Sequence, residues 1–102
     1  MVYLIHFDSP LKHARHYIGF TENLEQLFHE HAYGDKGAKL LHAVREAGIG
    51  FRVVNVWPTG DRYFERELKN KKNAHRLCPV CNPNLNCYTT PEGLVFQPEK
   101  EN

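Results

Sequence analysis

The hydrophobic residues of this chain fall into short runs whose spacing alternates between that of strands and that of helices. This pattern constrains the fold more than any other feature. Residues 2–7 are rich in branched and aromatic side chains and precede Asp-Ser-Pro, which predicts a buried strand that ends in a turn. Residues 16–21 predict a second strand that pairs with the first as a hairpin. Residues 51–57 return to strand character and end at Pro-Thr-Gly.

The segments between and after these strands have helical spacing. Residues 23–34 open with a suitable N-cap asparagine, and one stripe of the expected helix contains Leu24, Leu27, Phe28 and His31. Residues 38–48 predict a second helix that stops at a glycine suited to a left-handed C-cap. Residues 61–73 predict a third helix that begins at a capping aspartate and carries many charges.

The order of these elements predicts a small α/β (α+β) domain with the order β-β-α-α-β-α. We expect a short, three-stranded, mainly antiparallel sheet flanked by helices. Residues 1–81 form the expected domain. Residues 82–102 are rich in proline and asparagine, which favour turns and extended coil, so we expect a partly ordered tail there.

Length and composition exclude several classes of protein. A chain of 102 residues suits one domain and excludes a two-domain enzyme. The formal net charge of +1 means that nucleic acid could be bound only through a local basic patch. No hydrophobic run approaches the roughly 20 residues that cross a bilayer, and the first ten residues do not resemble a secretory signal. We therefore expect a cytoplasmic protein with no membrane partner.

The three cysteines are clustered near the end of the chain, which indicates metal binding rather than a disulfide framework. One histidine and the three cysteines have a spacing that could form a tetrahedral zinc site, namely His75, Cys78, Cys81 and Cys87. Such a site would anchor a tail that has few hydrophobic residues. The alternative is a turn held by Pro79 with buried thiols.

Several short motifs follow one another along the chain in an order that is typical of one family. Val2-Tyr3-Leu4 and Tyr17-Ile18-Gly19 lie on the two strands of the expected hairpin. Asn23-Leu24, His31, Gly37-Ala38-Lys39 and the acidic and basic run at residues 65–69 follow in sequence. Together these motifs resemble the GIY-YIG nuclease family over most of the chain. Residues 76–81, Arg-Leu-Cys-Pro-Val-Cys, resemble the end of the domain in a compact bacterial subgroup of that family.

The resemblance implies a DNA endonuclease with the GIY-YIG fold that hydrolyses phosphodiester bonds with one Mg²⁺ or Mn²⁺. Glu65 matches the helix glutamate that holds the metal, and a hard cation on one carboxylate can take further oxygens from water and the substrate. Tyr3 and Tyr17 match the tyrosines that position or deprotonate the attacking water. His31 could relay the proton. Without the resemblance, these tyrosines would be interpreted as core aromatics and Glu65 as the partner of a basic residue such as Lys69.

One position departs from the family pattern. Family members carry an arginine three residues after the leucine that opens the first helix, and here that residue is Leu27. An arginine there would bind the scissile phosphate, and the loss of such a donor costs on the order of 10²–10³ in rate. Three interpretations remain: a noncatalytic DNA-binding module (a pseudoenzyme), replacement by another cation such as Arg15, Lys39 or Arg45, or an engineered substitution.

DNA would be bound through basic and polar side chains spread over the hairpin and the helices. The expected contacts are Arg15, Lys39, Arg45, Arg66, Lys69, Lys72 and Asn73. A solvated helix face is the alternative interpretation of the residues near position 70. A protein-interaction domain without a nucleic-acid partner is a further class that agrees with the net charge near zero.

Overall fold

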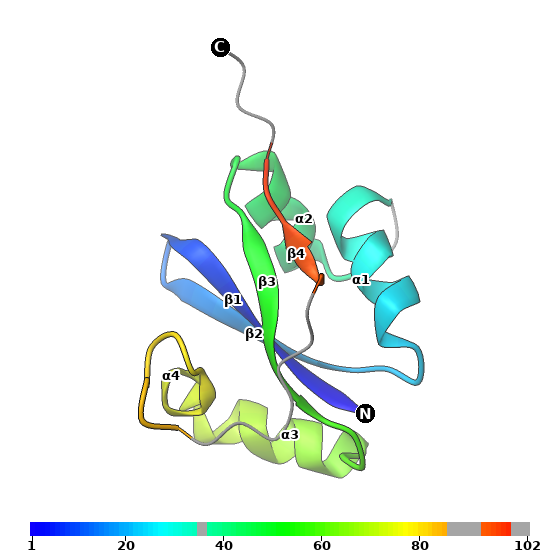
Figure 1. Ribbon diagram of the computed structural model, residues 1–102, viewed down its shortest axis with the longest axis vertical. Coiled ribbons are helices and arrows are strands. Elements are labelled where there is room, and N and C mark those ends of the chain that lie inside the picture. The colour runs from blue at the N-terminus through cyan, green and yellow to red at the C-terminus, as the bar shows by residue number, and fades with distance from the viewer. Residues whose placement is uncertain (35–36, 86–92, 99–102) are drawn as a thin grey trace.

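The computed structural model describes residues 1–34, 37–85 and 93–98 and shows a small α+β domain (Figure 1). The first six elements occur in the predicted order, and two short elements follow them. The elements are β1 (Val2–Leu11), β2 (Ala14–Phe20), α1 (Leu24–Tyr33), α2 (Lys39–Glu46), β3 (Phe51–Trp57), α3 (Arg62–Lys71), α4 (Ala74–Leu77) and β4 (Val95–Phe96).

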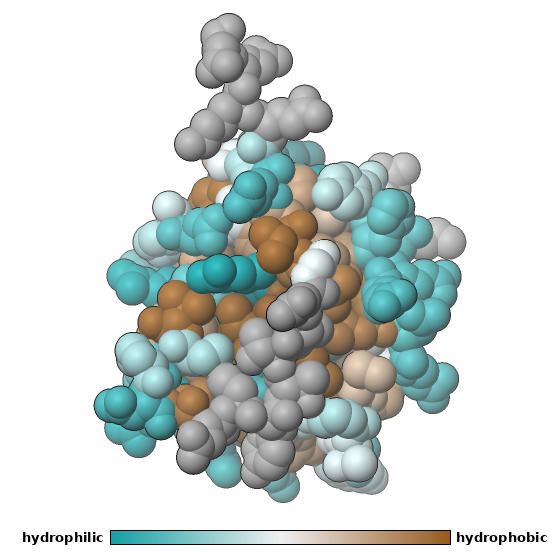
Figure 2. Space-filling view, in the orientation of Figure 1, coloured by the Kyte–Doolittle hydropathy of each residue, from teal (hydrophilic) through white to brown (hydrophobic). Residues whose placement is uncertain are grey.

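The sheet has four antiparallel strands in the order β2-β1-β3-β4, which corrects the prediction of three strands. The additional strand comes from the expected tail, where Phe96 pairs with Phe51. The two rings stack with their centroids 5.0 Å apart, and Phe96 is buried. Burial of this aromatic side chain offsets the entropy lost when the segment is ordered, so β3 does not remain an edge strand. Figure 2 shows hydrophobic side chains around β4 on this face of the molecule.

Helices cover both faces of the sheet, because side chains alternate along each strand. Tyr3, Ile5 and Phe7 of β1 belong to a core cluster that also contains residues of α1 and α2. Val2 and Leu4 belong to a second cluster, which includes residues of α3 and Cys78. The sheet therefore lies between α1 and α2 on one face and α3 and α4 on the other (Figure 1).

The hairpin of β1 and β2 is longer than the sequence predicts and carries functional candidates on both faces. Its strands extend to Leu11 and from Ala14, and Lys12 in the turn has a positive φ of 56°. The register pairs Ile5 with Tyr17 and His6 with His16. Consecutive pairs point to opposite faces, so Tyr17 faces the side of α1 while His6 and His16 face the side of α3 and α4.

The helices begin where the sequence predicts capping. The side chain of Asn23 accepts a hydrogen bond from the backbone N–H of Gln26 at 3.2 Å, and Asp61 accepts one from Phe64 at 2.9 Å. The short α4 was not predicted. It is attached to the sheet by Asn55, a buried residue of β3 whose side-chain N–H donates to the carbonyl of Leu77 at 3.1 Å. Within the described part of the chain, no helix combines the length and hydrophobicity needed to cross a membrane.

Candidate functional site

Three of the predicted catalytic side chains lie together on the α1 side of the hairpin. Tyr3 of β1, Tyr17 of β2 and His31 of α1 form a group that we call the tyrosine cluster. The ring centroids are 6.1 Å apart for the two tyrosines, 6.2 Å for Tyr3 and His31, and 5.8 Å for Tyr17 and His31. The phenol oxygen of Tyr3 lies 2.9 Å from Nε2 of His31. The cluster therefore joins residues that are up to 28 positions apart in the sequence.

The hydrogen bonds around His31 fix its tautomer. The backbone N–H of Ala38 donates to Nδ1 of His31 at 3.3 Å, so Nδ1 carries a lone pair and Nε2 carries the proton of the neutral ring. Nε2–H then donates to the oxygen of Tyr3. Burial and, to a smaller extent, the charge of His42 lower the pKa of His31 to about 4. Gly37 has a φ of 105° and packs against the imidazole where a Cβ would overlap it, which explains the Gly-Ala pair after α1.

Tyr3 is fully inside the protein and keeps its proton. Only 1% of its surface is exposed, and its ring lies over Gly19, where any side chain would overlap it. Burial raises the pKa of Tyr3, and the charge of Tyr17, a hydrogen bond with Tyr17 and the charge of Glu65 raise it further. Tyr3 therefore keeps its proton in the folded chain. Of the two roles expected for the tyrosines, to position or to deprotonate water, the burial of Tyr3 favours the first for this residue, whereas Tyr17 is only half-buried.

Glu65 lies on the first turns of α3, near the edge of the tyrosine cluster. Its side chain is 18% exposed and forms an ion pair with Lys69 at 3.4 Å, the alternative that the sequence left open. Lys69 also places its ammonium 5.5 Å from the centre of the Tyr17 ring. The contribution of Glu65 to the pKa of Tyr3 shows that its negative charge acts on the cluster.

Leu27 and Arg62 line one open groove of about 810 Å³ between β2, α1 and the start of α3. Leu27 packs partly buried against the core one turn before His31. The guanidinium of Arg62 lies 4.8 Å from the centre of the Phe20 ring. Sequence reasoning placed Arg62 in a basic run that could face a duplex but did not name it as a replacement for the missing arginine, although it is three residues before Glu65 on the same helix. The groove therefore has an arginine on α3 where the family pattern has one on α1.

The expected DNA contacts are distributed over both faces of the sheet. Lys69 and Lys72 border a pocket of about 300 Å³ that also contains Tyr17, and Arg15 borders a neighbouring pocket with Lys72. Lys39 is exposed at the start of α2, on the opposite face. Arg45 is half-buried and donates to the carbonyl of Gly34 at 2.9 Å, which joins α2 to the end of α1. The guanidinium of Arg45 is thus engaged within the fold.

Arg66 and Asn73 complete the predicted set of DNA contacts. Arg66 is exposed on α3. Asn73 precedes α4, and its side-chain oxygen is buried with no hydrogen-bond partner among residues 1–34, 37–85 and 93–98. That oxygen is out of contact with solvent, so Asn73 is less accessible than its neighbours on α3.

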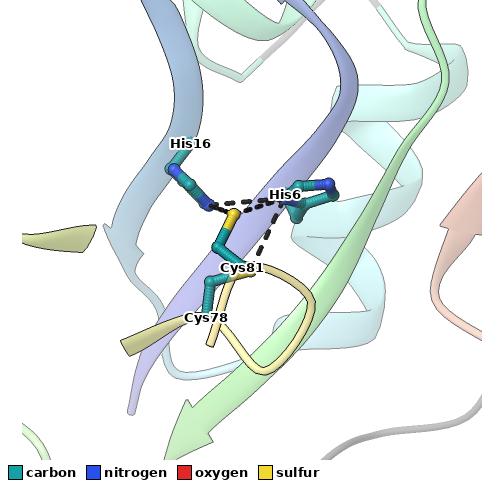
Figure 3. Close-up of side chains that lie close together, drawn as sticks. All are labelled: His6, His16, Cys78 and Cys81. Atoms are coloured by element: carbon teal, nitrogen blue, oxygen red, sulfur yellow. Dashed lines mark hydrogen bonds between the residues drawn. The ribbon is translucent and has the colours of Figure 1, made fainter. Parts of the chain in front are cut away.

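A second group lies on the other face of the hairpin, where two histidines meet two cysteines. His6 of β1, His16 of β2, and Cys78 and Cys81 after α4 bring their ligand atoms within 4.8 Å of one another. We call this group the His₂Cys₂ cluster, and Figure 3 shows the four side chains pointing toward a common centre. Such a donor set could hold a metal ion such as zinc.

The His₂Cys₂ cluster corrects the zinc ligands predicted from sequence. Cys78 and Cys81 belong to it, but its histidines come from the hairpin, and His75 is exposed on α4 outside the group. Cys87 lies outside the described residues. The spacing of residues along the chain could not reveal this set, because His6 and His16 meet Cys78 only through the sheet register and the packing of α4.

The buried setting shifts the pKa values of the cluster. Burial and, to a smaller extent, the charges of His6, His75 and Arg15 lower the pKa of His16 to about 4. Burial also lowers the pKa of His6, and Arg52 adds to this effect. For Cys78, burial raises the pKa of the thiol. Both imidazoles are therefore neutral at pH 7 and carry the lone pairs that a metal requires.

Comparison of the chain with family models, with curated proteins and with solved structures gives no match. The two clusters and the basic residues beside them are therefore the basis for any statement about function.

Proposed function

We propose that this chain is a DNA endonuclease of the GIY-YIG type that hydrolyses a phosphodiester bond with a divalent cation. The observation that carries the proposal is the convergence of Tyr3, Tyr17 and His31 beside Glu65. These are the four residues that the motif resemblance selects. The free cysteines in the described part of the chain agree with a reducing compartment, so we place this activity in the cytoplasm.

The two tyrosines of the cluster differ in their access to a bound water. Tyr17 is half-buried and borders an open pocket, whereas Tyr3 is fully buried and is held by His31 at 2.9 Å. Tyr17 is therefore the residue that accepts the proton of the attacking water, and Tyr3 and His31 are positioning residues.

Glu65 is suited to hold the cation jointly with the substrate. It offers one partly buried carboxylate, and Mg²⁺ is commonly held by one or two carboxylates, waters and a substrate phosphate. Lys69 must release Glu65 when the cation binds, and the freed ammonium then stays beside Tyr17 to face a phosphate. The bound cation would neutralise charge on the phosphate as the leaving oxygen departs.

Arg62 is the residue that replaces the missing helix arginine in this proposal. It shares the groove with Leu27 and lies on the same helix as Glu65. Its guanidinium is free to reach a phosphate from a position stacked on Phe20. This assignment differs from Arg15, Lys39 and Arg45, the residues that the sequence suggested.

Cleavage assays on branched, duplex and single-stranded DNA in Mg²⁺ or Mn²⁺ test the proposal with matched variants. We expect Tyr17→Phe and Glu65→Gln each to lower the rate by on the order of 10²–10³, the effect of losing a group that acts in the transition state. Tyr33→Phe and Glu67→Gln are the controls, because both residues are exposed and neither lines the groove of Leu27 and Arg62, and they should cut at the wild-type rate. Cleavage that survives Glu65→Gln would show that the activity belongs to a contaminant or to another site.

A noncatalytic DNA-binding module is the second candidate function, and two observations favour it. Leu27 leaves α1 without its arginine, and Lys69 occupies the carboxylate of Glu65. In that case wild-type protein would bind DNA without cutting it. Leu27→Arg separates the candidates: new cleavage in this variant alone would support the noncatalytic module. If wild-type protein cuts and Arg62→Ala does not, the replacement by Arg62 is supported.

A further inference from the structure

We propose that His6, His16, Cys78 and Cys81 bind one Zn²⁺ ion in a closed structural site that fastens the segment after α3 to the β1–β2 hairpin. This site lies on the opposite face of the hairpin from the tyrosine cluster. The proposal therefore stands whether or not the chain cuts DNA.

Four of the six distances between the ligand atoms are close to those of tetrahedral zinc, and all six are within 4.8 Å. With Zn–N near 2.0–2.1 Å and Zn–S near 2.3 Å, two nitrogens lie about 3.3 Å apart, and a nitrogen and a sulfur lie about 3.6 Å apart. Nδ1 of His6 is 3.3 Å from Nε2 of His16. Sγ of Cys81 is 3.5 Å from Nε2 of His16 and 3.8 Å from Nδ1 of His6, and Sγ of Cys78 is 3.5 Å from Nδ1 of His6.

Hydrogen bonding alone does not account for these contacts. Nδ1 of His6 can take part in one ordinary hydrogen bond, either as a donor or as an acceptor. Three ligand atoms lie around it, from His16, Cys78 and Cys81. A cation at the centre would satisfy all four groups at once, because each would direct a lone pair toward it. Figure 3 shows the contacts meeting between the hairpin and the turn after α4.

A redox role for Cys78 and Cys81 is disfavoured by their surroundings. Reactive Cys-X-X-Cys pairs have a thiol whose pKa is lowered at a helix N-terminus or beside a cation. Here Cys78 follows the C-terminal end of α4, and it is fully buried. The two cysteines are not joined in a disulfide. Two imidazoles and two cysteines, which bind a metal as thiolates, are instead a donor set of structural zinc.

Such a site would add to the hydrogen bond from Asn55 that holds the segment after α3 on the sheet. No residue of α4 is buried, and Cys78 is the buried residue that follows it. Zinc would join residues 72 and 75 positions apart along the chain, from His6 to Cys78 and Cys81. Closure of so long a loop removes much conformational freedom from the unfolded chain. All four positions of the ion are taken by protein, so no open position is left for substrate or water.

Metal analysis of the full chain, expressed without a histidine tag and purified without chelator, tests the proposal. We expect about one zinc ion per chain. Cys81→Ser should reduce the zinc content at least about tenfold, and because Cys81 is exposed the variant should still fold. His16→Ala should have the same effect. His75→Ala and Cys87→Ser are the controls from the ligand set that the sequence suggested, and both should retain the ion.

Cobalt substitution provides a measurement that does not depend on the stability of variants. Co²⁺ added to zinc-depleted protein should give the intense visible bands of a tetrahedral ion and a sulfur-to-cobalt band, and Cys81→Ser should weaken the sulfur band. The proposal is overturned if the tag-free wild-type chain contains no stoichiometric zinc, if Cys81→Ser retains the ion fully, or if Cys78 and Cys81 are found as a disulfide. Loss of zinc from Cys87→Ser would show that Cys87 is a ligand and that the proposed ligand set is wrong.

Discussion

His31 is both a core residue and a member of the tyrosine cluster. It is 1% exposed, donates to Tyr3 and accepts from the backbone of Ala38, so its neutral form is built into the fold. A proton added to the ring would remove the bond from Ala38 and leave a buried charge. The stability of the domain should therefore depend on the protonation of this one residue.

We expect His31 to make the free energy of unfolding fall as the pH is lowered from about 6.5 to about 4. Its pKa is about 4 in the folded chain and near 6.5 in the unfolded chain, so the unfolded state binds more protons in this window. Stability from this residue is complete above about pH 6.5, and about 3 kcal/mol of it is lost by pH 4. Urea unfolding of wild type and His31→Gln at both pH values isolates the effect. An equal pH dependence in both proteins would contradict it.

The sequence predicts the members of the tyrosine cluster better than their roles. Tyr3, Tyr17 and His31 could be chosen because the motifs appear in a fixed order along an expected hairpin and helix. The buried strand that contains Tyr3 was expected, but the packing of its ring over Gly19 could not be predicted, because it depends on the register with the neighbouring strand. The role of Arg62 as a replacement arginine could not be predicted for a related reason, since its contact with Phe20 arises only when α3 packs on β2.

At the scale of elements, the described tail contributes to the core through β4. Phe96→Ala removes a buried ring that stacks on Phe51, and we expect a loss of about 3 kcal/mol in the free energy of unfolding. Val95→Ala is the matched control, because Val95 is 43% exposed on the same two-residue strand, and it should change stability by less than about 0.5 kcal/mol. Denaturant unfolding measures both variants. Equal effects would mean that β4 is not held by the stacking of Phe96.

Periodicity predicts the longer elements and fails for the shorter ones. Each of the six predicted elements spans at least seven residues in the structure, long enough to repeat a spacing of two or of three to four residues. The four residues of α4 and the two of β4 cannot repeat any spacing. Tertiary contacts determine both: Asn55 holds the end of α4, and Phe51 holds β4.

At the scale of the whole molecule, the β1–β2 hairpin places two different chemistries on its two faces. Consecutive side chains of a strand point to opposite faces, so Tyr17 faces α1 and His16 faces α4. Sequence reasoning identified the two cysteines of the His₂Cys₂ cluster but not its two histidines. The cluster requires the pairing of His6 with His16, which depends on the hairpin register, together with the return of the chain after α3. A hairpin register that pairs two histidines is the signal that could have revealed it.

We expect the basic side chains on the β2–α3 face to make the DNA affinity of the molecule depend on salt. Lys72 is exposed and borders the pockets beside Tyr17 and Arg15, whereas Lys39 is exposed on α2 across the sheet. If a duplex lies along β2 and α3, Lys72 neutralises a phosphate and releases a counterion, but Lys39 does not. Lys72→Gln should then weaken binding of any DNA sequence and reduce the slope of log affinity against log salt by about 0.9.

Lys39→Gln is the control for this prediction, because it makes the same change of charge on the opposite face. Fluorescence anisotropy with a labelled duplex at several salt concentrations measures both variants against wild type. Equal loss of affinity in the two variants would indicate attraction by net charge alone, since a change of one charge acts at long range irrespective of the face that carries it. A reduced slope in Lys72→Gln alone would instead place the DNA backbone along α3, within reach of Arg62 and Glu65, which is where the proposed cleavage requires it.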